Sequence, residues 1–407
     1  ESDGVDEKLN LIKNSLQSFP VLFLFCGQVV SPCFFRPRQH SRHDGLIHEP
    51  AGLECGCGTF RARSSDIIAS MQPDRQNNDF HRFCVAPMMD WTDRHCRFFH
   101  RMLAPSALLY SEMVTTGAVL HGDRDRLLGF NEQEHPLALQ LGGSDPAELA
   151  KCARIGHERG YDEINLNVGC PSDRVRKGRF GACLMLEPGL VADCVSAMRE
   201  AVDVPVTVKT RIGVDDCYSY GYFSDFVSRI SESGCTVFIV HARKAWLSGL
   251  CPKENREVPE LRYDLVYRIK REFPGLTIVL NGGVLSVADV LQHLQHLDGV
   301  MLGRAAYQNP WVLAEIQRSL YGAPGVPDRD TAVSRMTDYL RSQARLGVPV
   351  RKISRHLLGL YQGLPGARSW RRFISEHAHL DSANDQLLLQ ALDAMKASIP
   401  SRGRHVA

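Results

Sequence analysis

The 407-residue sequence has no long uninterrupted apolar run, no closely paired CxxC cysteines and no GxGxxG dinucleotide-binding motif. Its most apolar stretch, PVLFLFCGQVVSPCFF at residues 20–35, is interrupted by glycine, glutamine and proline. It falls short of the roughly 20 apolar residues that span a bilayer, so we expect no integral membrane protein. The 44% hydrophobic and 23% charged composition instead predicts a soluble globular chain of two or three domains.

The 13 cysteines are scattered singly, without a recurring spacing that would indicate a zinc site or a disulfide framework. We expect most of them to be buried reduced thiols in a reducing compartment. The one CxC pair, Cys55 and Cys57, lies in an irregular stretch, and no metal site is predicted. A cytoplasmic location follows, or an organelle if the N-terminal segment is a targeting sequence.

Residues 1–78 show no steady hydrophobic period and end in the polar stretch MQPDRQNNDF. We predict an N-terminal extension with little structure of its own. It starts with the acidic ESDGVDEK and without an initiator Met, which is compatible with a fragment of a targeting segment or with foreign sequence. Met71 is a candidate natural start.

Between residues 79 and 322 the pattern changes to short β-rich runs, each followed by a stretch long enough for a helix. The runs are RFCVAPM, ALLYSEM, PLALQLG, DEINLNVG, VPVTVKT, CTVFIVHA, LTIVLNGG and DGVMLGR. Eight alternating βα units predict a (β/α)₈ TIM barrel, in which catalytic groups lie at the C-terminal ends of the strands. A doubly wound open sheet is the second choice, because its usual GxGxxG motif is missing.

After residue 322 the β pattern stops, and residues 323–400 predict helices separated by glycine and proline, followed by a tail at 401–407. Residues 325–407 carry 13 Lys+Arg against 7 Asp+Glu, and six bases but no acid lie between Arg351 and Arg372. This small helical domain therefore has a basic excess. Charge alone fits a polyanion-binding surface as well as a solvated helix face.

Two methionines, several polar side chains and a set of glycines follow the ends of the predicted strands. They are Met88, Met89, Asp90, Gln140, Asn167, Cys170, Lys209, Arg211, His241, Arg243, Asn281, Gly282, Gly283, Gly303 and Arg304. In a barrel they would converge on one mouth, as expected for a functional site.

Two features of this set point to an anionic ligand. The turns LNGGV and LGRAA follow the last two predicted strands, where barrels commonly bind phosphate, although two tight structural turns are the alternative. Lys209 in VTVKTR is predicted to point into the mouth, where its buried charge needs an anionic partner. A reduced flavin is such a partner, because its N1–C2 edge carries negative charge.

The motifs in this region resemble the tRNA-dihydrouridine synthase family, most closely its bacterial DusA type. The similarity runs from about Phe83 to Ser375 and rests on APMMDWTDRHCR, YSEMVTTGA, LQLGGSDP, EINLNVGCPSDRV, FGACLM, VTVKTRIG, HARKAWLSGL, PKENRE, NGG, DGVMLGRAAYQNP and LPGARSWRR. It implies an FMN enzyme that uses NADPH to reduce the C5=C6 bond of uridine to 5,6-dihydrouridine in the tRNA D-loop, at positions 20 and 20a for this type. The hydride goes from flavin N5 to C6, and Cys170 of the GCP turn gives the proton to C5, a task that suits a thiol near neutral pH.

The resemblance also implies roles for other residues. Those implied to surround the flavin are Pro87, Met88, Met89, Gln140, Lys209, His241, Asn281, Gly282, Gly283, Gly303 and Arg304. Asn167 is implied to bind the uracil, and Lys253, Arg256, Arg368 and Arg371 to contact tRNA; Arg211 or Arg243 is expected to hold a neighbouring phosphate. The missing Rossmann motif favours FMN over FAD. We expect a monomer with no obligate protein partner.

Two other functions stay open. A flavin barrel that reduces or oxidises a free pyrimidine, like dihydroorotate or dihydropyrimidine dehydrogenases, would have no use for a basic helical domain. A tRNA-binding or tRNA-folding protein with dispensable chemistry would leave Cys170 and Lys209 free to vary.

Overall fold

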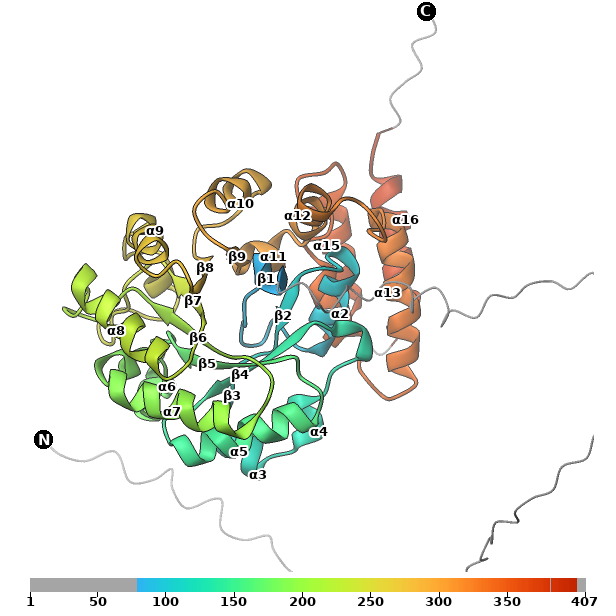
Figure 1. Ribbon diagram of the computed structural model, residues 1–407. Helices are drawn as coiled ribbons and strands as arrows, with labels where there is room; N and C mark the ends of the chain where they lie inside the picture. The colour runs from blue at the N-terminus through green and yellow to red at the C-terminus, as the bar shows by residue number, and fades with distance from the viewer. Residues whose placement is uncertain (1–78, 381, 401–407) are drawn as a thin grey trace, which may run out of the picture. The chain divides into compact units, whose positions relative to one another are not determined.

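The computed structural model describes residues 79–380 and 382–400 (Figure 1). The predicted N-terminal extension and the tail from 401 to 407 lie outside the described residues. Nine strands form one parallel sheet: β1 (Phe83–Val85), β2 (Leu108–Tyr110), β3 (Val114–Thr115), β4 (Leu137–Gly142), β5 (Glu163–Val168), β6 (Val206–Arg211), β7 (Val237–His241), β8 (Thr277–Asn281) and β9 (Gly299–Leu302).

The sheet closes into a barrel because β1 pairs with both β2 and β9, and β2 pairs with β4. The short β3 lies outside the ring and pairs only with the end of β4. The remaining eight strands are the eight predicted from the sequence, so the (β/α)₈ barrel is confirmed. The closure contradicts the open-sheet alternative.

Helices surround the barrel (Figure 1). They are α2 (Arg94–Leu103), α3 (Thr116–His121), α4 (Arg124–Leu128), α5 (Pro146–Glu158), α6 (Asp173–Lys177), α7 (Pro188–Ala201), α8 (Tyr220–Glu232), α9 (Tyr263–Glu272), α10 (Val287–His293), α11 (Arg304–Gln308) and α12 (Trp311–Tyr321), with the 3₁₀ turns η2 (Asp79–Arg82), η3 (Glu132–Glu134), η4 (Gly181–Leu186) and η5 (Glu254–Arg256). Local sequence sets their ends: at α5 the Asp145 side chain accepts from the Glu148 N–H, and Pro146 occupies the first turn.

Strand alternation separates two environments. In β5 the apolar Ile164, Leu166 and Val168 belong to the large core between strands and helices. The intervening residues Glu163 and Asn165 are also buried, and they hydrogen-bond inside the ring. A smaller apolar cluster inside the barrel includes Tyr110 and Ile239. The period of two along a strand therefore directs polar side chains of β5 into the barrel interior.

The C-terminal part is helical, as predicted, and is shown in orange to red in Figure 1. Its elements are α13 (Arg329–Ala344), α14 (Val350–Ser354), η6 (Arg355–Leu357), α15 (Ala367–His377) and α16 (Leu387–Ala397). The division into domains at residues 322 and 323 remains a prediction. Within the described residues no helix is both long and apolar enough to cross a membrane.

Asp93 joins the helical part to the barrel. Its carboxylate caps α2 by accepting from the His95 and Cys96 N–H groups, and it also accepts from Arg355 Nη2 at 2.7 Å and pairs with His356 Nε2 at 3.0 Å. Burial raises the pKa of Asp93, but the hydrogen bond and charge of His356, together with the hydrogen bonds from the Cys96 N–H and Arg355, outweigh burial and hold that pKa below its usual range. The basic helices thus have a fixed anchor on the loop that follows β1.

Candidate active site

Cys170 lies half-buried in the turn that follows β5. The Asn167 Oδ1 atom accepts hydrogen bonds from the N–H groups of Gly169 at 3.2 Å and Cys170 at 3.0 Å. The Cys170 carbonyl accepts from Ala182 N–H at 2.9 Å. Gly181, at φ +77°, leaves room for this contact, because a Cβ there would lie 2.5 Å from the Cys170 oxygen. Hydrogen bonds to Asn167 and Ala182 therefore fix the backbone that carries the thiol.

A chain of side-chain hydrogen bonds runs from this turn into the barrel. Asn167 Nδ2 donates to Gln140 Oε1 at 2.9 Å, and Gln140 Nε2 donates to Asn165 Oδ1 at 2.8 Å. Asn165 Nδ2 then donates to Thr207 Oγ1 at 2.8 Å. In each buried amide the oxygen accepts a hydrogen bond and the nitrogen donates one. The chain therefore fixes the orientation of Gln140 and Asn167.

The chain ends on the buried carboxylate of Glu163. Thr207 Oγ1 donates to Glu163 Oε1 at 2.6 Å, Tyr110 OH donates to the same oxygen at 2.7 Å, and His81 Nε2 lies 2.6 Å from Oε2. Burial lowers the pKa of His81, but the Glu163 charge and hydrogen bond outweigh burial and raise it. A satisfied ionic cluster therefore lies at the opposite end of the barrel from Cys170.

Lys209 is the half-buried cation of the mouth. Its Nζ donates to Asn281 Oδ1 at 3.1 Å, and Asn281 Nδ2 in turn donates to the Met301 carbonyl at 2.8 Å. Burial and then the Arg211 charge together lower the pKa of Lys209 to about 8, while Cys170 acts in the opposite direction. No carboxylate of the described residues contributes to this shift, and Cys170 is the one acidic group that does. The site thus suits a ligand that brings negative charge to Lys209.

His241 and two glycines lie on the neighbouring strand ends. Gly282 and Gly283 have φ values of +101° and +76°, and a Cβ on Gly282 would lie 2.6 Å from His241 Cδ2. Burial, and then the charges of Arg211 and Lys209, keep the pKa of His241 well below its usual value. Its ring is therefore neutral at pH 7.

The two arginines near these turns have different partners. Arg304 Nη1 lies 2.5 Å from Glu257 Oε1, while Arg243 Nη1 donates to the carbonyls of Pro259 and Glu257. The Arg243 Nε atom is buried without a hydrogen-bond partner among the described residues. Gly303 faces open space, with no atom within 4 Å of a built Cβ. A free donor beside an open turn fits a phosphate-bearing ligand.

The loop after β1 forms another side of the mouth. Thr92 Oγ1 accepts from the Met88 N–H at 2.9 Å, and the Met89 side chain is 53% exposed. Asp90 has φ +63° and donates its N–H to the Glu112 carboxylate. These contacts fix the segment that begins with Pro87.

The expected tRNA-contacting residues fall into two groups. Lys253 and Arg256 are exposed on the loop between β7 and α9. Burial and the Arg304 charge lower the pKa of Arg256, while Cys170 acts in the opposite direction, so Arg256 lies near the thiol. Arg368 and Arg371 belong to α15, where Arg368 is exposed and Arg371 Nη1 donates to Gln362 at 2.9 Å. Among the described residues no hydrogen bond or ion pair joins α15 to the strand-end residues.

Residues 84–397 match the family model described as "Dihydrouridine synthase (Dus)". The chain belongs to the dihydrouridine synthase family. It is therefore an enzyme, an oxidoreductase, and the resemblance seen in its motifs is confirmed. It is 60% identical over 313 residues to "tRNA-dihydrouridine(20/20a) synthase" of Vibrio parahaemolyticus, covering 76% of this chain and 96% of that protein.

Two further relatives carry the same printed name. The protein of Salmonella typhi is 57% identical and covers 79% of this chain and 98% of its own length. The protein of Escherichia coli O6:H1 is 58% identical, with coverages of 77% and 95%. Among solved structures, a chain from a 2-naphthoyl-CoA reductase complex aligns with a TM-score of 0.46 at 10% identity, covering 60% of this chain and 50% of that chain.

Arg211 of this dihydrouridine synthase differs from the expectation of a phosphate-binding side chain. The guanidinium is buried, its Nε donates to the Gly169 carbonyl at 2.9 Å, and its Nη1 donates to the carbonyls of Lys244 at 3.0 Å and Asn255 at 2.9 Å. Burial lowers the pKa of Arg211 to about 10. Because two of its three nitrogens are used on backbone carbonyls, Arg211 acts as a link between the Cys170 turn and the loop that carries Lys253.

We expect Arg211→Met to destabilise the protein by about 2–4 kcal/mol, because it leaves three carbonyls without their charged donor. Denaturant unfolding measures this change. Arg211→Lys should recover only part of the loss, since a lysine cannot reproduce the spread of the guanidinium. The exposed Arg154→Met on α5 is the control, and equal stability of the Arg211 and Arg154 variants would contradict the linking role.

Sequence reasoning missed several residues of the dihydrouridine synthase site. Asn165, Thr207 and Glu163 build the hydrogen-bond chain beneath Gln140. Asn255, fully buried, holds the loop between β7 and α9 by accepting from the Trp246 N–H at 2.8 Å and donating to the Leu250 carbonyl at 3.1 Å. Alternation is the sequence signal that could have revealed the polar residues of β5, since polar residues at every second position of EINLN share one face of a strand.

Proposed function

We propose that this enzyme reduces the C5=C6 bond of uridine to 5,6-dihydrouridine in the D-loop of tRNA, at positions 20 and 20a, with FMN as cofactor and NADPH as reductant. The printed name of the relatives, "tRNA-dihydrouridine(20/20a) synthase", supports the substrate and the positions. The observation that carries the chemistry is the placement of Cys170. Its thiol lies at the C-terminal end of β5, on a fixed turn beside the half-buried Lys209.

The residues of the mouth fit FMN. Lys209 is a half-buried cation without a carboxylate partner among the described residues, and it suits the electron-rich edge of an isoalloxazine ring. The Gln140 amide, oriented by Asn165 and Asn167, would hydrogen-bond the same ring. His241, Asn281, Gly282 and Gly283 would lie along the cofactor, with Met88 and Met89 at its other side. Gly303, Arg304 and the free Nε of Arg243 would hold the phosphate.

Cys170 is proposed as the general acid. A bound reduced flavin would supply the hydride to C6 of the uracil. Cys170 would give its proton to C5, which leaves a thiolate close to Lys209 and Arg211. Those two cations would stabilise the thiolate, just as a thiolate there raises the pKa of each cation. Asn167 would hold the turn through this step and offer its amide to the uracil.

The tRNA must present its uridine outside the folded loop, because a base inside a structured RNA cannot reach a thiol in a barrel mouth. Lys253 and Arg256 on the loop after β7 would contact phosphates near the target nucleotide. Arg368 and Arg371 on α15 would contact a more distant part of the tRNA. This arrangement gives the basic helical part a use that a free-pyrimidine enzyme would not have.

The proposal predicts that the purified protein forms dihydrouridine in tRNA that lacks it when FMN and NADPH are supplied. Mass spectrometry measures the gain of two hydrogens per uridine, and nuclease fragments locate the modified positions. Dihydrouridine formed at positions other than 20 and 20a would change the proposed target uridines. A yellow protein that oxidises NADPH and reduces free uracil or orotate, yet leaves tRNA unchanged, would replace the proposal with a free-pyrimidine reductase.

A further inference from the structure

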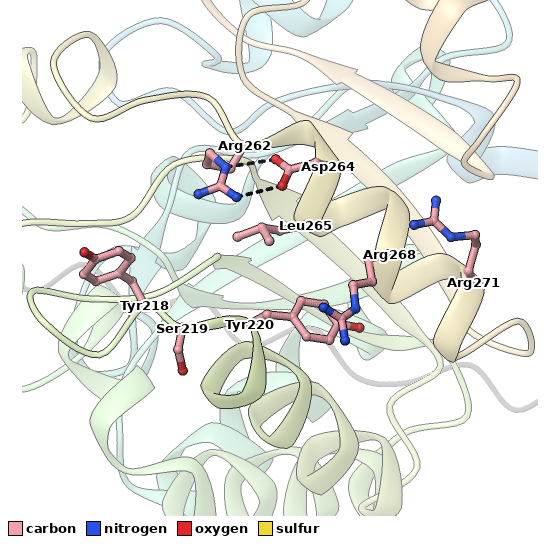
Figure 2. Close-up of a pocket in the computed structure, with 8 residues that line it drawn as sticks. All are labelled: Tyr218, Ser219, Tyr220, Arg262, Asp264, Leu265, Arg268 and Arg271. Atoms are coloured by element: carbon pink, nitrogen blue, oxygen red, sulfur yellow. Dashed lines mark hydrogen bonds and ion pairs between the residues drawn. The ribbon is translucent and has the colours of Figure 1, made fainter.

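A groove of about 500 Å³ lies on the barrel between α8 and α9, outside the mouth residues described above (Figure 2). Tyr218 and Tyr220 come to it from the connection before α8 and the start of α8, and Arg262, Arg268 and Arg271 come from the start and the length of α9. Neither the sequence motifs nor the proposed chemistry uses these residues. The groove combines aromatic faces with several cations, which is the composition of a surface that binds a nucleic-acid strand.

The groove starts at the mouth end of the barrel. Tyr218 lies in the connection after β6, the strand that carries Lys209, and Arg262 lies in the connection after β7, the strand that carries His241. In a parallel barrel both connections leave the C-terminal ends of their strands, the end where Cys170 lies. From Arg262 the groove follows α9 for about 14 Å, at 1.5 Å per helical residue.

The charge of the groove is mostly unpaired. Arg262 forms two hydrogen bonds with Asp264, at 2.9 and 2.7 Å. Arg268 and Arg271, by contrast, are exposed, and neither forms an ion pair with any described residue. The Arg268 guanidinium lies 3.6 Å from the centre of the Tyr220 ring, and Tyr220 OH donates to the Glu272 carboxylate. This stacking holds the guanidinium in place, with its N–H edges available to an anion.

Lys244 connects the groove to the catalytic turn. Its Nζ lies 3.9 Å from the centre of the Tyr218 ring and 3.8 Å from that of the Trp246 ring. Its carbonyl accepts from Arg211, which also binds the Gly169 carbonyl beside Cys170. Tyr218 remains 46% exposed, so its ring is open to a ligand. A series of basic and aromatic residues therefore connects the Cys170 turn to the groove.

We propose that the groove between α8 and α9 binds the sugar–phosphate backbone of the tRNA substrate, on a strand that continues from the nucleotide in the mouth. This inference rests on the proposed tRNA function and extends it to a surface on the opposite side of the mouth from the β1 loop and the helical part. Arg268 and Arg271 contact phosphates, and the exposed Tyr218 ring offers a stacking face to a base or ribose. Such contacts determine how tightly the tRNA binds, and they do not determine which uridine is reduced.

The test compares two double variants with the same loss of charge. Arg268→Ala with Arg271→Ala removes the two unpaired cations of the groove. Lys151→Ala with Arg154→Ala removes two exposed cations from α5 and serves as the control. Fluorescence anisotropy measures tRNA affinity for each across a salt series, and dihydrouridine formation at saturating tRNA measures turnover. Hydroxyl-radical footprinting of the bound tRNA identifies the protected segment.

We expect the groove variant to bind tRNA about tenfold more weakly than the control, with a salt slope reduced by about 2. Turnover at saturating tRNA should be unchanged, and one backbone segment should lose its protection. Equal affinity, slope and footprint in the two double variants would overturn the inference. An effect on a small anion such as inorganic phosphate, without an effect on tRNA, would also overturn it. If wild-type protein neither binds nor modifies tRNA, the proposed function itself fails.

Discussion

Cys170→Ala is expected to lose about 10²–10⁴-fold in dihydrouridine formation, the range that a positioned general acid contributes. The variant keeps the backbone contacts of the turn, because Asn167 Oδ1 and Ala182 N–H bind main-chain atoms of residue 170 and not the thiol. FMN and tRNA affinities should therefore stay within about twofold of wild type. Single-turnover reduction of tRNA by pre-reduced enzyme isolates the chemical step from cofactor reduction.

Cys183→Ala provides a matched control for this prediction. Cys183 is also half-buried and lies in the segment that packs on the Cys170 turn, but its thiol donates to the Phe180 carbonyl at 3.2 Å. Burial raises the pKa of Cys183, as expected for a structural thiol. We expect turnover close to wild type in this variant. If Cys170→Ala instead turned over as fast as Cys183→Ala, another group would have to protonate C5.

The barrel could be predicted from the sequence because its strands are short, apolar and separated by amphipathic stretches. Runs such as CTVFIVHA are buried on both faces of a closed parallel sheet, so they contain few polar residues until the strand ends. His241 and Asn281 mark those ends, and both lie where the pattern predicted. The helices of the C-terminal part were equally clear, since glycine and proline separate them.

The partners of the polar side chains could not be predicted, because they depend on strand register. Gln140 is the register partner of Asn165, and Asn165 is the partner of Thr207. That alignment produces the hydrogen-bond chain, and a shift of one strand by two residues would keep the alternation but break the chain. Arg211 shows the same limit. Alternation places it at the mouth, but its carbonyl partners come from the Cys170 turn and from the loop between β7 and α9.

Lys209 gives the second large effect, which appears in the pH dependence of FMN binding. Burial lowers the pKa of this lysine to about 8 in the chain without ligand. An anionic partner favours the charged lysine and raises its pKa. Binding of reduced FMN at pH 8 should therefore take up as much as about half a proton, because the lysine is half charged at its pKa, and the affinity should fall as pH rises through 8. At pH 6 the lysine is already charged and this uptake should vanish. Calorimetry in two buffers of different ionisation enthalpy measures the uptake.

Two substitutions separate the charge of Lys209 from its titration. Lys209→Met should weaken FMN binding by about 10–100-fold and abolish proton uptake at pH 8, since about 1.4 kcal/mol corresponds to tenfold in affinity. Lys209→Arg keeps a charge that does not titrate in this range, so it should bind FMN without proton uptake. The exposed Lys151→Met should behave as wild type in both measurements. Undiminished uptake in Lys209→Met would assign the proton to another group and remove Lys209 as the cation that faces the flavin.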